Sequence, residues 1–179
     1  MDILISSNFE RFLYYVTGSR KTVAEDMQHL KETGIYSITK EELAKVKKDM
    51  DGGWASQEMM EKAMADVYAK YDYLMDPHTA VAYSVYDGMR KNGIIPRHTH
   101  TVIISTAHPY KFPGVVAKTL GISEKESPYD TLRSIEDKTG IAIPKQLAEL
   151  EKREVRFNQV VDRSQMAETI ADYVNEIKK

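Results

Sequence analysis

Residues 101–105 have the sequence TVIIS, and this stretch decides the fold that the sequence predicts. Its continuous apolar, β-branched character is typical of a strand buried on both faces, as in a parallel sheet. A helix is predicted just before it, because Asp76 followed by Pro77 resembles an N-cap and first helical turn, and the apolar spacing continues to about Arg90. A helix that leads into a buried strand indicates an α/β arrangement of layers.

Most of the remaining chain is predicted to be helical. Three pairs match the capping box, in which a hydroxyl and a glutamate satisfy free backbone donors: Ser7 with Glu10, Thr22 with Glu25, and Thr39 with Glu42. They predict helices at about 8–17, 23–33 and 40–50, ended by Gly18, Gly34 and Gly52. Further helices are predicted at about 56–71, 114–120 and 164–177. Ser56 is the predicted cap of the first of these, and its face of Met60, Met64, Val67, Tyr68 and Tyr71 is interpreted as core packing, the alternative being a cofactor pocket.

A second strand is predicted at Ile3–Ile5, so residue 2 is already expected to be inside a core. The predicted fold is therefore α/β and helix-rich, a single domain over 1–179 with a partial parallel sheet and packed helices. Two strands are few for a sheet buried on both faces. Natural chain termini usually begin more loosely than this, so both the early strand and the shortage of strands indicate that something is missing.

Composition limits the classes of function. The chain has 179 residues, of which 42% are hydrophobic and 29% charged, and its net charge is −2. This charge offers no overall field for nucleic acid or an anionic membrane, so no partner of either kind is predicted. There is no cysteine, which excludes thiol chemistry and predicts a reducing, cytoplasmic setting. No stretch is long and apolar enough to span a membrane.

The first candidate site follows the predicted strand 101–105. Ligands of open α/β sheets bind beyond the carboxyl ends of the strands, where Ser105, Thr106, His108 and Lys111 are expected. The alternatives are that the hydroxyls bond the turn backbone, that the histidine is a partly buried packing residue, and that the lysine is a surface charge.

Two other turns carry candidate residues. At the helix start after Asp76, free backbone donors and the Thr79 hydroxyl could bind an anion, although Asp76 could itself be a simple N-cap. Ser7, Asn8 and Arg11 form a hydroxyl-rich turn with an arginine suited to phosphate, the alternative being a salt bridge. The histidines are not accompanied by the cysteines or carboxylates of a metal site, so no metal is predicted.

Three stretches together carry a resemblance to a known family: MDILISSNFERFLYY (1–15), YDYLMDPHTAVAY (71–83) and ISTAHPYKFP (104–113). In this order and at comparable spacing they resemble the C-terminal portion of threonine synthase of the longer, bacterial and fungal type. The resemblance covers about residues 1–120, and more loosely the remainder. Agreement of three separated motifs is far more specific than any one of them.

The resemblance implies a pyridoxal phosphate (PLP) enzyme of fold type II. Such an enzyme is a lyase of threonine biosynthesis that converts O-phosphohomoserine and water to threonine and phosphate, with the cofactor as electron sink. In these enzymes a serine or threonine faces the pyridine nitrogen, and Thr106, or alternatively Ser105, is expected in that role. His108 and Lys111 would line the same rim. The substrate would contact Thr79, and its phosphate would contact Ser7, Asn8 and Arg11.

The sequence also departs from the family pattern. The Schiff-base lysine of the family lies in a phenylalanine-lysine-aspartate motif, and the cofactor phosphate in a glycine-asparagine loop, both further upstream; neither motif occurs here. Lys111 does not occupy that motif, so no catalytic residue is assigned. We therefore expect weak or no cofactor binding and no turnover by this chain alone.

Within the resemblance, about 20–75 is expected to be a helical insertion, 76–121 a cofactor-domain remnant and 122–179 a C-terminal tail. The upstream strands would normally cover an apolar sheet edge, so we expect that surface to be hidden by self-association or by a complementary N-terminal chain. The alternative function is a stand-alone binding or assembly module derived from the enzyme, which needs such a complementary chain.

Overall fold

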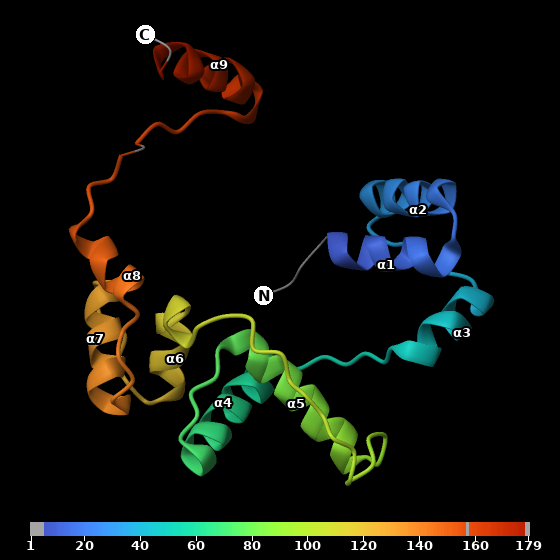
Figure 1. Cartoon of the computed structure of the whole chain (residues 1–179), viewed down its shortest axis with the longest axis horizontal. Coiled ribbons are helices and arrows are strands. Elements are labelled where there is room, and N and C mark those ends of the chain that lie inside the picture. The colour runs from blue at the N-terminus through green and yellow to red at the C-terminus, as the bar shows by residue number, and fades with distance from the viewer. Residues whose placement is uncertain (1–5, 157, 178–179) are drawn as a thin grey trace. The chain divides into compact units, whose positions relative to one another are not determined.

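The computed structural model describes residues 6–156 and 158–177. The chain forms two compact units, Met1–Trp54 and Ala55–Lys179 (Figure 1). Every regular element in these described ranges is a helix. Each unit has its own buried residues and is described separately below.

The first unit contains α1 (Ser7–Thr17), α2 (Arg20–Thr33) and α3 (Lys40–Asp49). Helix α1 packs against α2 and α3, and its Leu13 is fully buried, as is nearly all of Val23 of α2. Gly18 allows the tight turn between α1 and α2 because it adopts a left-handed conformation with φ 65°.

The capping residues of this unit differ in part from those predicted. The capping box of Thr39 and Glu42 is confirmed, with both side-chain-to-backbone bonds present. The boxes at Ser7 and Thr22 are wrong, because Ser6 caps α1 and Ser19 caps α2. Where hydroxyl residues occur close together, the cap is the one whose oxygen reaches the backbone N–H three residues later. Helix α3 ends at Asp49 and not near Gly52.

The second unit begins with α4 (Gln57–Tyr71) and α5 (Pro77–Lys91), which pack against each other. Their predicted caps, Ser56 and Asp76, are confirmed. A 3-10 turn, η1 (Pro109–Lys111), leads into α6 (Pro113–Thr119), which packs against α4 and against α7 (Pro128–Thr139). The remaining elements are α8 (Lys145–Ala148), η2 (Glu149–Lys152), η3 (Arg163–Gln165) and α9 (Met166–Ile177).

The core of this unit lies where α4, α5, α6 and α7 meet. It consists of apolar side chains with at most 9% of their surface exposed: Met60, Ala63, Met64, Val67, Leu74, Met75, Ala80, Tyr110, Val116, Ala117, Leu120, Leu132 and Ile135. The methionines and valine of α4 recur at helical spacing, which confirms the interpretation of that stripe as core packing.

The predicted partial parallel sheet is wrong. Residues 101–105 are extended but form no strand, and no strand occurs anywhere in residues 6–156 or 158–177. Val102 is 83% exposed and Ile104 69% exposed, so the stretch is not buried on both faces. A strand requires a neighbouring strand to pair its backbone groups. The other predicted strand, Ile3–Ile5, lies outside the described residues.

The extended segment runs back along α5, from the end of that helix to its beginning (Figure 1). At the far end, Arg90 Nη1 donates to the Pro96 carbonyl oxygen at 2.9 Å. At the near end, the hydroxyl oxygens of Thr79 and Ser105 are 3.2 Å apart. The segment therefore brings its last residues to the N-terminus of α5.

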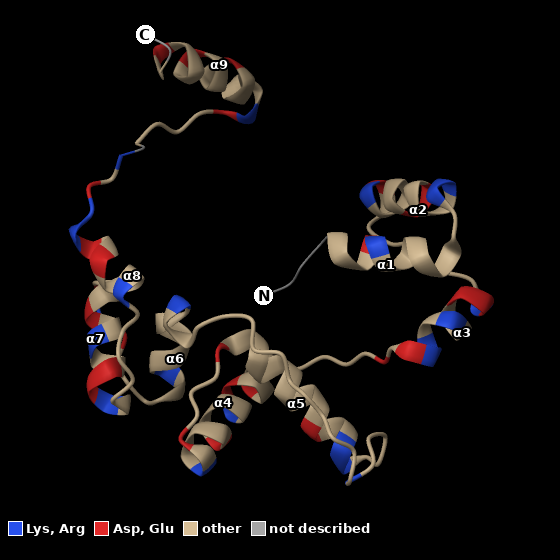
Figure 2. Cartoon of the chain, viewed as in Figure 1, with Lys and Arg blue, Asp and Glu red and all other residues tan. Residues whose placement is uncertain are grey.

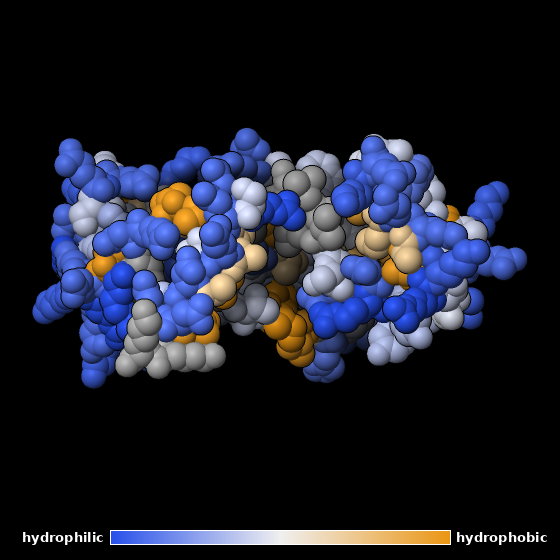
Figure 3. Space-filling model, turned by 90° about the horizontal axis from the view of Figure 1, so that it is seen from above, coloured by the Kyte–Doolittle hydropathy of each residue, from blue (hydrophilic) through white to orange (hydrophobic). Residues whose placement is uncertain are grey.

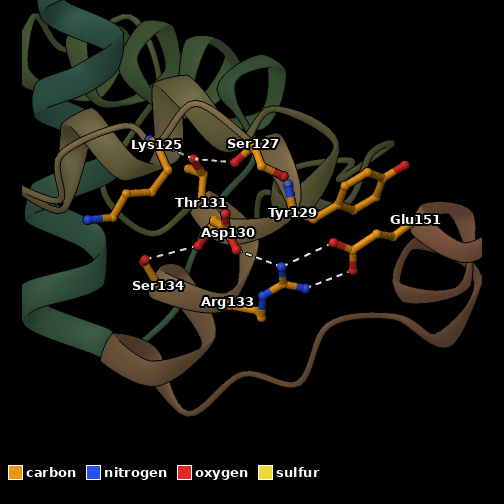
Figure 4. A network of polar contacts seen from close by, with 8 residues as sticks. All are labelled: Lys125, Ser127, Tyr129, Asp130, Thr131, Arg133, Ser134 and Glu151. Carbon is orange, nitrogen blue, oxygen red and sulfur yellow. Dashed lines mark hydrogen bonds and ion pairs between the residues drawn. The ribbon is translucent and has the colours of Figure 1, made fainter.

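A polar network joins α7 to the turns around it (Figure 4). Arg133 donates to both carboxylate oxygens of Glu151 in η2, at 2.8 and 3.1 Å, and to Asp130 at 2.6 Å. The buried Thr131 hydroxyl accepts from the Lys125 backbone N–H at 3.0 Å. The hydrogen bond from Arg133 lowers the pKa of Glu151, which keeps the pair ionised near neutral pH.

Charged and apolar residues share the surface of both units. Figure 2 shows acidic and basic residues interspersed on the helices, with Arg90 and Lys91 at the last turn of α5. Figure 3 shows hydrophobic residues as patches between hydrophilic ones. Helix α9 exposes apolar side chains at helical spacing, namely Met166, Ile170, Tyr173, Val174 and Ile177. None of the helices in the described ranges has the length and hydropathy needed to cross a membrane.

The Tyr110 side chain links η1 to the segment after α7 through a hydrogen bond, and the loss of this bond should measurably lower the stability of the fold. The ring is 1% exposed and the hydroxyl donates to the Ile141 carbonyl oxygen. Tyr110→Phe should lower the free energy of unfolding by about 1 kcal/mol, the usual net contribution of such a bond. Urea unfolding followed by circular dichroism measures this. Tyr129→Phe is the control, because the Tyr129 hydroxyl makes no hydrogen bond among the described residues; an equal loss there would contradict the assignment.

The difference in stability between wild type and Tyr110→Phe should depend on pH. Burial raises the pKa of Tyr110 above its usual 10.0, so the folded state holds the phenol proton more tightly than the unfolded state does. The stabilisation is therefore complete below pH 10 and is lost as the pH rises through the folded-state pKa. The difference in stability between wild type and Tyr110→Phe should shrink as the pH rises above about 10. A difference that grows over this range would contradict the burial effect.

Candidate functional site

The candidate site begins with the cap of α5. Asp76 is 1% exposed, and its Oδ1 accepts from the backbone N–H groups of His78 and Thr79 at 2.9 and 3.3 Å. Its Oδ2 accepts from the Thr79 hydroxyl. Proline at the first helical position presets the backbone for this geometry, since its missing N–H would be unpaired there in any case. Both oxygens of the carboxylate therefore accept hydrogen bonds from the first turn of the helix.

Two predicted site residues meet at this cap. Thr79, which is 4% exposed, lies 3.2 Å from Ser105 through their hydroxyl oxygens, although 26 residues separate them in sequence. The structure therefore joins the motif that contains Asp76 to the motif that contains Ser105. Thr106 follows; like Ser105 it is exposed, and its hydroxyl has no partner among the residues that the structure describes.

A hollow of about 340 Å³ lies beside these two hydroxyls. Its volume is within the usual range for small-molecule sites. Burial, together with the nearby carboxylate of Asp87, raises the pKa of Tyr83. The hollow is lined by aromatic and apolar side chains and the two hydroxyl residues: Val67, Tyr71, Tyr73, Met75, Thr79, Tyr83, Ile103 and Ser105.

His108 and Lys111 lie on the turn after Ser105. The His108 ring stacks on Tyr110, with centroids 5.3 Å apart, and its Nδ1 accepts from the Tyr110 backbone N–H at 3.2 Å. Both His108 and Lys111 are exposed. A second ring contact, which the sequence did not predict, lies at the cap itself. The ring centroids of His78 and Phe112 are 5.0 Å apart.

Ser7, Asn8 and Arg11 lie in the first unit, at the start of α1. All three are exposed, and Arg11 Nη2 donates to Asn8 Oδ1. Arg11 also lines a hollow of about 340 Å³ with Arg20 and Tyr14. The arrangement presents cationic donors beside aromatic faces, together with the carboxylate of Glu10.

The lining tyrosines are the residues that sequence reasoning missed. Tyr83 is four residues after Thr79 on α5, so both lie on the same face of the helix. That spacing was the available signal for Tyr83. No comparable signal exists for Tyr73, which is in the connection between α4 and α5. Within the described ranges, no three His, Asp or Glu side chains are placed to hold one metal ion.

Comparison with known proteins agrees with the motifs. Residues 79–174 match the family model described as threonine synthase, C-terminal. Threonine synthase of Pseudomonas aeruginosa is 34% identical over 157 residues, covering 87% of this chain and 29% of that protein. The chain thus spans less than a third of the length of this relative.

Solved structures give the same result. The match to the crystal structure of yeast threonine synthase covers 98% of this chain and 36% of the yeast chain, with a TM-score of 0.71 and 25% sequence identity. The match to the crystal structure of PLP-bound threonine synthase from Brucella melitensis covers 86% of this chain and 29% of the Brucella chain, with a TM-score of 0.60 and 28% sequence identity. These relatives are one class of enzyme, and the matched model describes their C-terminal region. The chain belongs to the threonine synthase family.

The cap predicts a large effect at Thr79 and a small one at Ser105. Thr79→Val keeps the shape of the side chain but leaves a buried Asp76 oxygen without its hydroxyl donor. We expect it to lower the free energy of unfolding by about 1–3 kcal/mol. Ser105→Ala, which leaves the cap intact, should cost less than about 0.5 kcal/mol. Chemical denaturation measures both, and equal costs would mean that the cap does not depend on the Thr79 hydroxyl.

Proposed function

We propose that this chain provides the C-terminal part of a threonine synthase that converts O-phosphohomoserine and water to threonine and phosphate with PLP. One observation carries the proposal: the 3.2 Å contact of Thr79 with Ser105 joins two family motifs at one hollow. Membership of the family and the likeness to a PLP-bound relative support it. The assignment of about 20–75, 76–121 and 122–179 to insertion, cofactor-domain and tail segments belongs to this proposal.

The residues at the hollow fit a pyridine ring. Asp76 is consumed by the cap of α5, so hydroxyl groups are the donors and acceptors offered at this end of the segment. We propose that Thr106, or alternatively Ser105, contacts the pyridine nitrogen. A hydroxyl is a weaker partner than a carboxylate and leaves the ring less firmly protonated. When bound, PLP supplies an electron sink for carbanions of the substrate.

The remaining site residues would hold the substrate. Arg11 presents a planar set of N–H donors suited to two phosphate oxygens, and Ser7 and Asn8 add polar groups on the same turn. Thr79, His108 and Lys111 would line the rim around Ser105. Their roles are to bind and orient O-phosphohomoserine, since none of them replaces the missing Schiff-base motif.

The chain should need a complementary part to turn over substrate. The phenylalanine-lysine-aspartate and glycine-asparagine motifs of the family do not occur in its sequence. Without the lysine there is no covalent attachment of the cofactor, and without the loop its phosphate lacks a cradle. We therefore propose that the chain alone binds PLP weakly or not at all.

A second candidate function is an assembly module that pairs with a complementary chain without catalysis. The exposed Val102 and Ile104 favour it, because large apolar side chains in an extended segment are usually covered. The two candidates differ in one respect, which is whether the assembled pair releases phosphate.

Complementation tests the proposal. The purified chain is titrated with PLP, reduced with borohydride and assayed for phosphate release from O-phosphohomoserine, alone and after co-expression with the upstream part of the Pseudomonas aeruginosa relative. We expect no specific adduct and no turnover alone, and both with the partner. Assembly without turnover would favour the module. A reduced adduct on a lysine of the isolated chain, with turnover, would contradict the proposal.

Variants of the assembled pair test the ring contact. Thr106→Ala, and separately Ser105→Ala, should show which hydroxyl contacts the ring: the loss of a hydrogen bond to a charged group should lower the rate roughly 10–100-fold. Lys138→Met is the control, because this exposed residue of α7 is outside the candidate site. Full activity of both hydroxyl variants would exclude the proposed contact.

A further inference from the structure

The direction of the hydrogen bonds at the α5 cap follows from counting protons. Thr79 Oγ1 contacts both Asp76 Oδ2 and Ser105 Oγ. A hydroxyl carries a single proton, so it can donate to only one of these two oxygens. An ionised carboxylate can only accept. The Thr79 proton is therefore committed to Asp76, which the N-terminus of α5 stabilises as an anion.

The contact between the two hydroxyls must then run the other way. With its own proton on Asp76, Thr79 has only lone pairs to offer at its 3.2 Å contact with Ser105, so a hydrogen bond between the two hydroxyls requires that Ser105 donates. The chain of bonds runs from Ser105 to Thr79 to Asp76. Ser105 Oγ is left with lone pairs alone for any ligand in the hollow, which it lines.

We propose that Asp76 and Thr79 are positioning residues that fix the Ser105 hydroxyl as a hydrogen-bond acceptor, so that the hollow selects a ligand ring bearing N–H over one with a bare nitrogen. The inference rests on the proposed function, because it takes the cofactor ring as that ligand. It also favours Ser105 over Thr106 for the ring contact, since Ser105 lines the hollow and is oriented by buried groups.

The other ionisable groups near these hydrogen bonds are tyrosines, histidines and one lysine. Tyr71 of α4, Tyr73 of the following connection and Tyr83 of α5 line the hollow. His78 Nδ1 lies 3.2 Å from Asp76 Oδ1, the oxygen that does not contact the Thr79 hydroxyl. His108 and Lys111 follow Ser105 on the next turn. None of these is bonded to the Thr79 or Ser105 hydroxyl, so the direction of the bonds depends on Asp76.

The first measurement needs no ligand. Proton NMR of the chain gives the exchange rate of the Thr79 hydroxyl with water, compared with that of the exposed Thr101. If Thr79 donates to the buried carboxylate, its exchange should be at least about tenfold slower than that of Thr101, and Ser105→Ala should leave it slow. A tenfold or greater acceleration in Ser105→Ala would mean that Thr79 donates to Ser105, and would overturn the inference.

The second measurement uses pyridoxine 5′-phosphate, which needs no lysine, labelled with ¹⁵N in the ring. Measured on the pair assembled with the upstream part of the Pseudomonas aeruginosa relative, the ring ¹⁵N shift at a series of pH values gives the affinity for the ring with and without its N–H. We expect a preference for the N–H form that falls roughly fivefold to tenfold in Thr79→Val, as the loss of one hydrogen bond implies. Thr79→Ser should restore it, whereas a merely structural role would not require the hydroxyl.

The outcomes separate the two proposals. Thr119→Val, outside the hollow, is the matched control and should bind as wild type does. An unchanged preference in Thr79→Val would overturn the positioning role while leaving the ring site in place. Absence of probe binding by the assembled pair even at millimolar concentration would overturn the placement of the ring in this hollow, and hence the proposed contact, whereas the hydroxyl exchange result stands on the free chain.

Discussion

The second unit depends on one buried carboxylate. Asp76 lies at the start of α5, where it satisfies backbone N–H groups that a helix leaves unpaired, and binds the Thr79 hydroxyl. Because the charge is removed from water, each of these bonds is needed to offset its desolvation. Through Thr79 the same carboxylate reaches Ser105, so the helix start and the returning segment are held together at the point where the hollow forms.

This arrangement explains how residues far apart in sequence can serve one site without a sheet. In a parallel sheet, neighbouring strands would place the end of residues 101–105 beside its partners. In this chain α5 replaces the neighbouring strand. The segment runs back along α5 (Figure 1), and the hydroxyls of Thr79 and Ser105 meet at the N-terminus of that helix. Tyr83, one turn further along α5, then becomes part of the lining. The carboxylate itself stays out of reach of a ligand, so the chemistry offered to the hollow is that of hydroxyls and aromatic rings.

Local features of the fold could be predicted where the determining contacts are local. Ser56, Thr39 and Asp76 were recognisable as caps because a capping oxygen needs only a backbone N–H two or three residues later. The buried stripe of α4 was visible from its spacing. At Ser6 and Ser19 the prediction was wrong by one or by three residues, since adjacent hydroxyls compete for the same role and the sequence does not rank them. The candidate residues Thr79 and Ser105 were found as separate motifs, whereas the contact between them was not.

The sequence by itself determined most of the helices, the caps Thr39, Ser56 and Asp76, and membership of the threonine synthase family, since these depend on neighbouring residues or on ordered motifs. Only the tertiary structure decided the state of residues 101–105. Their β-branched run favours an extended backbone, but a strand exists only when another strand pairs with it, and in the described residues none does. Tertiary structure also decided which hydroxyls meet, because a 3.2 Å contact across 26 residues depends on the path of the returning chain, which no local pattern specifies.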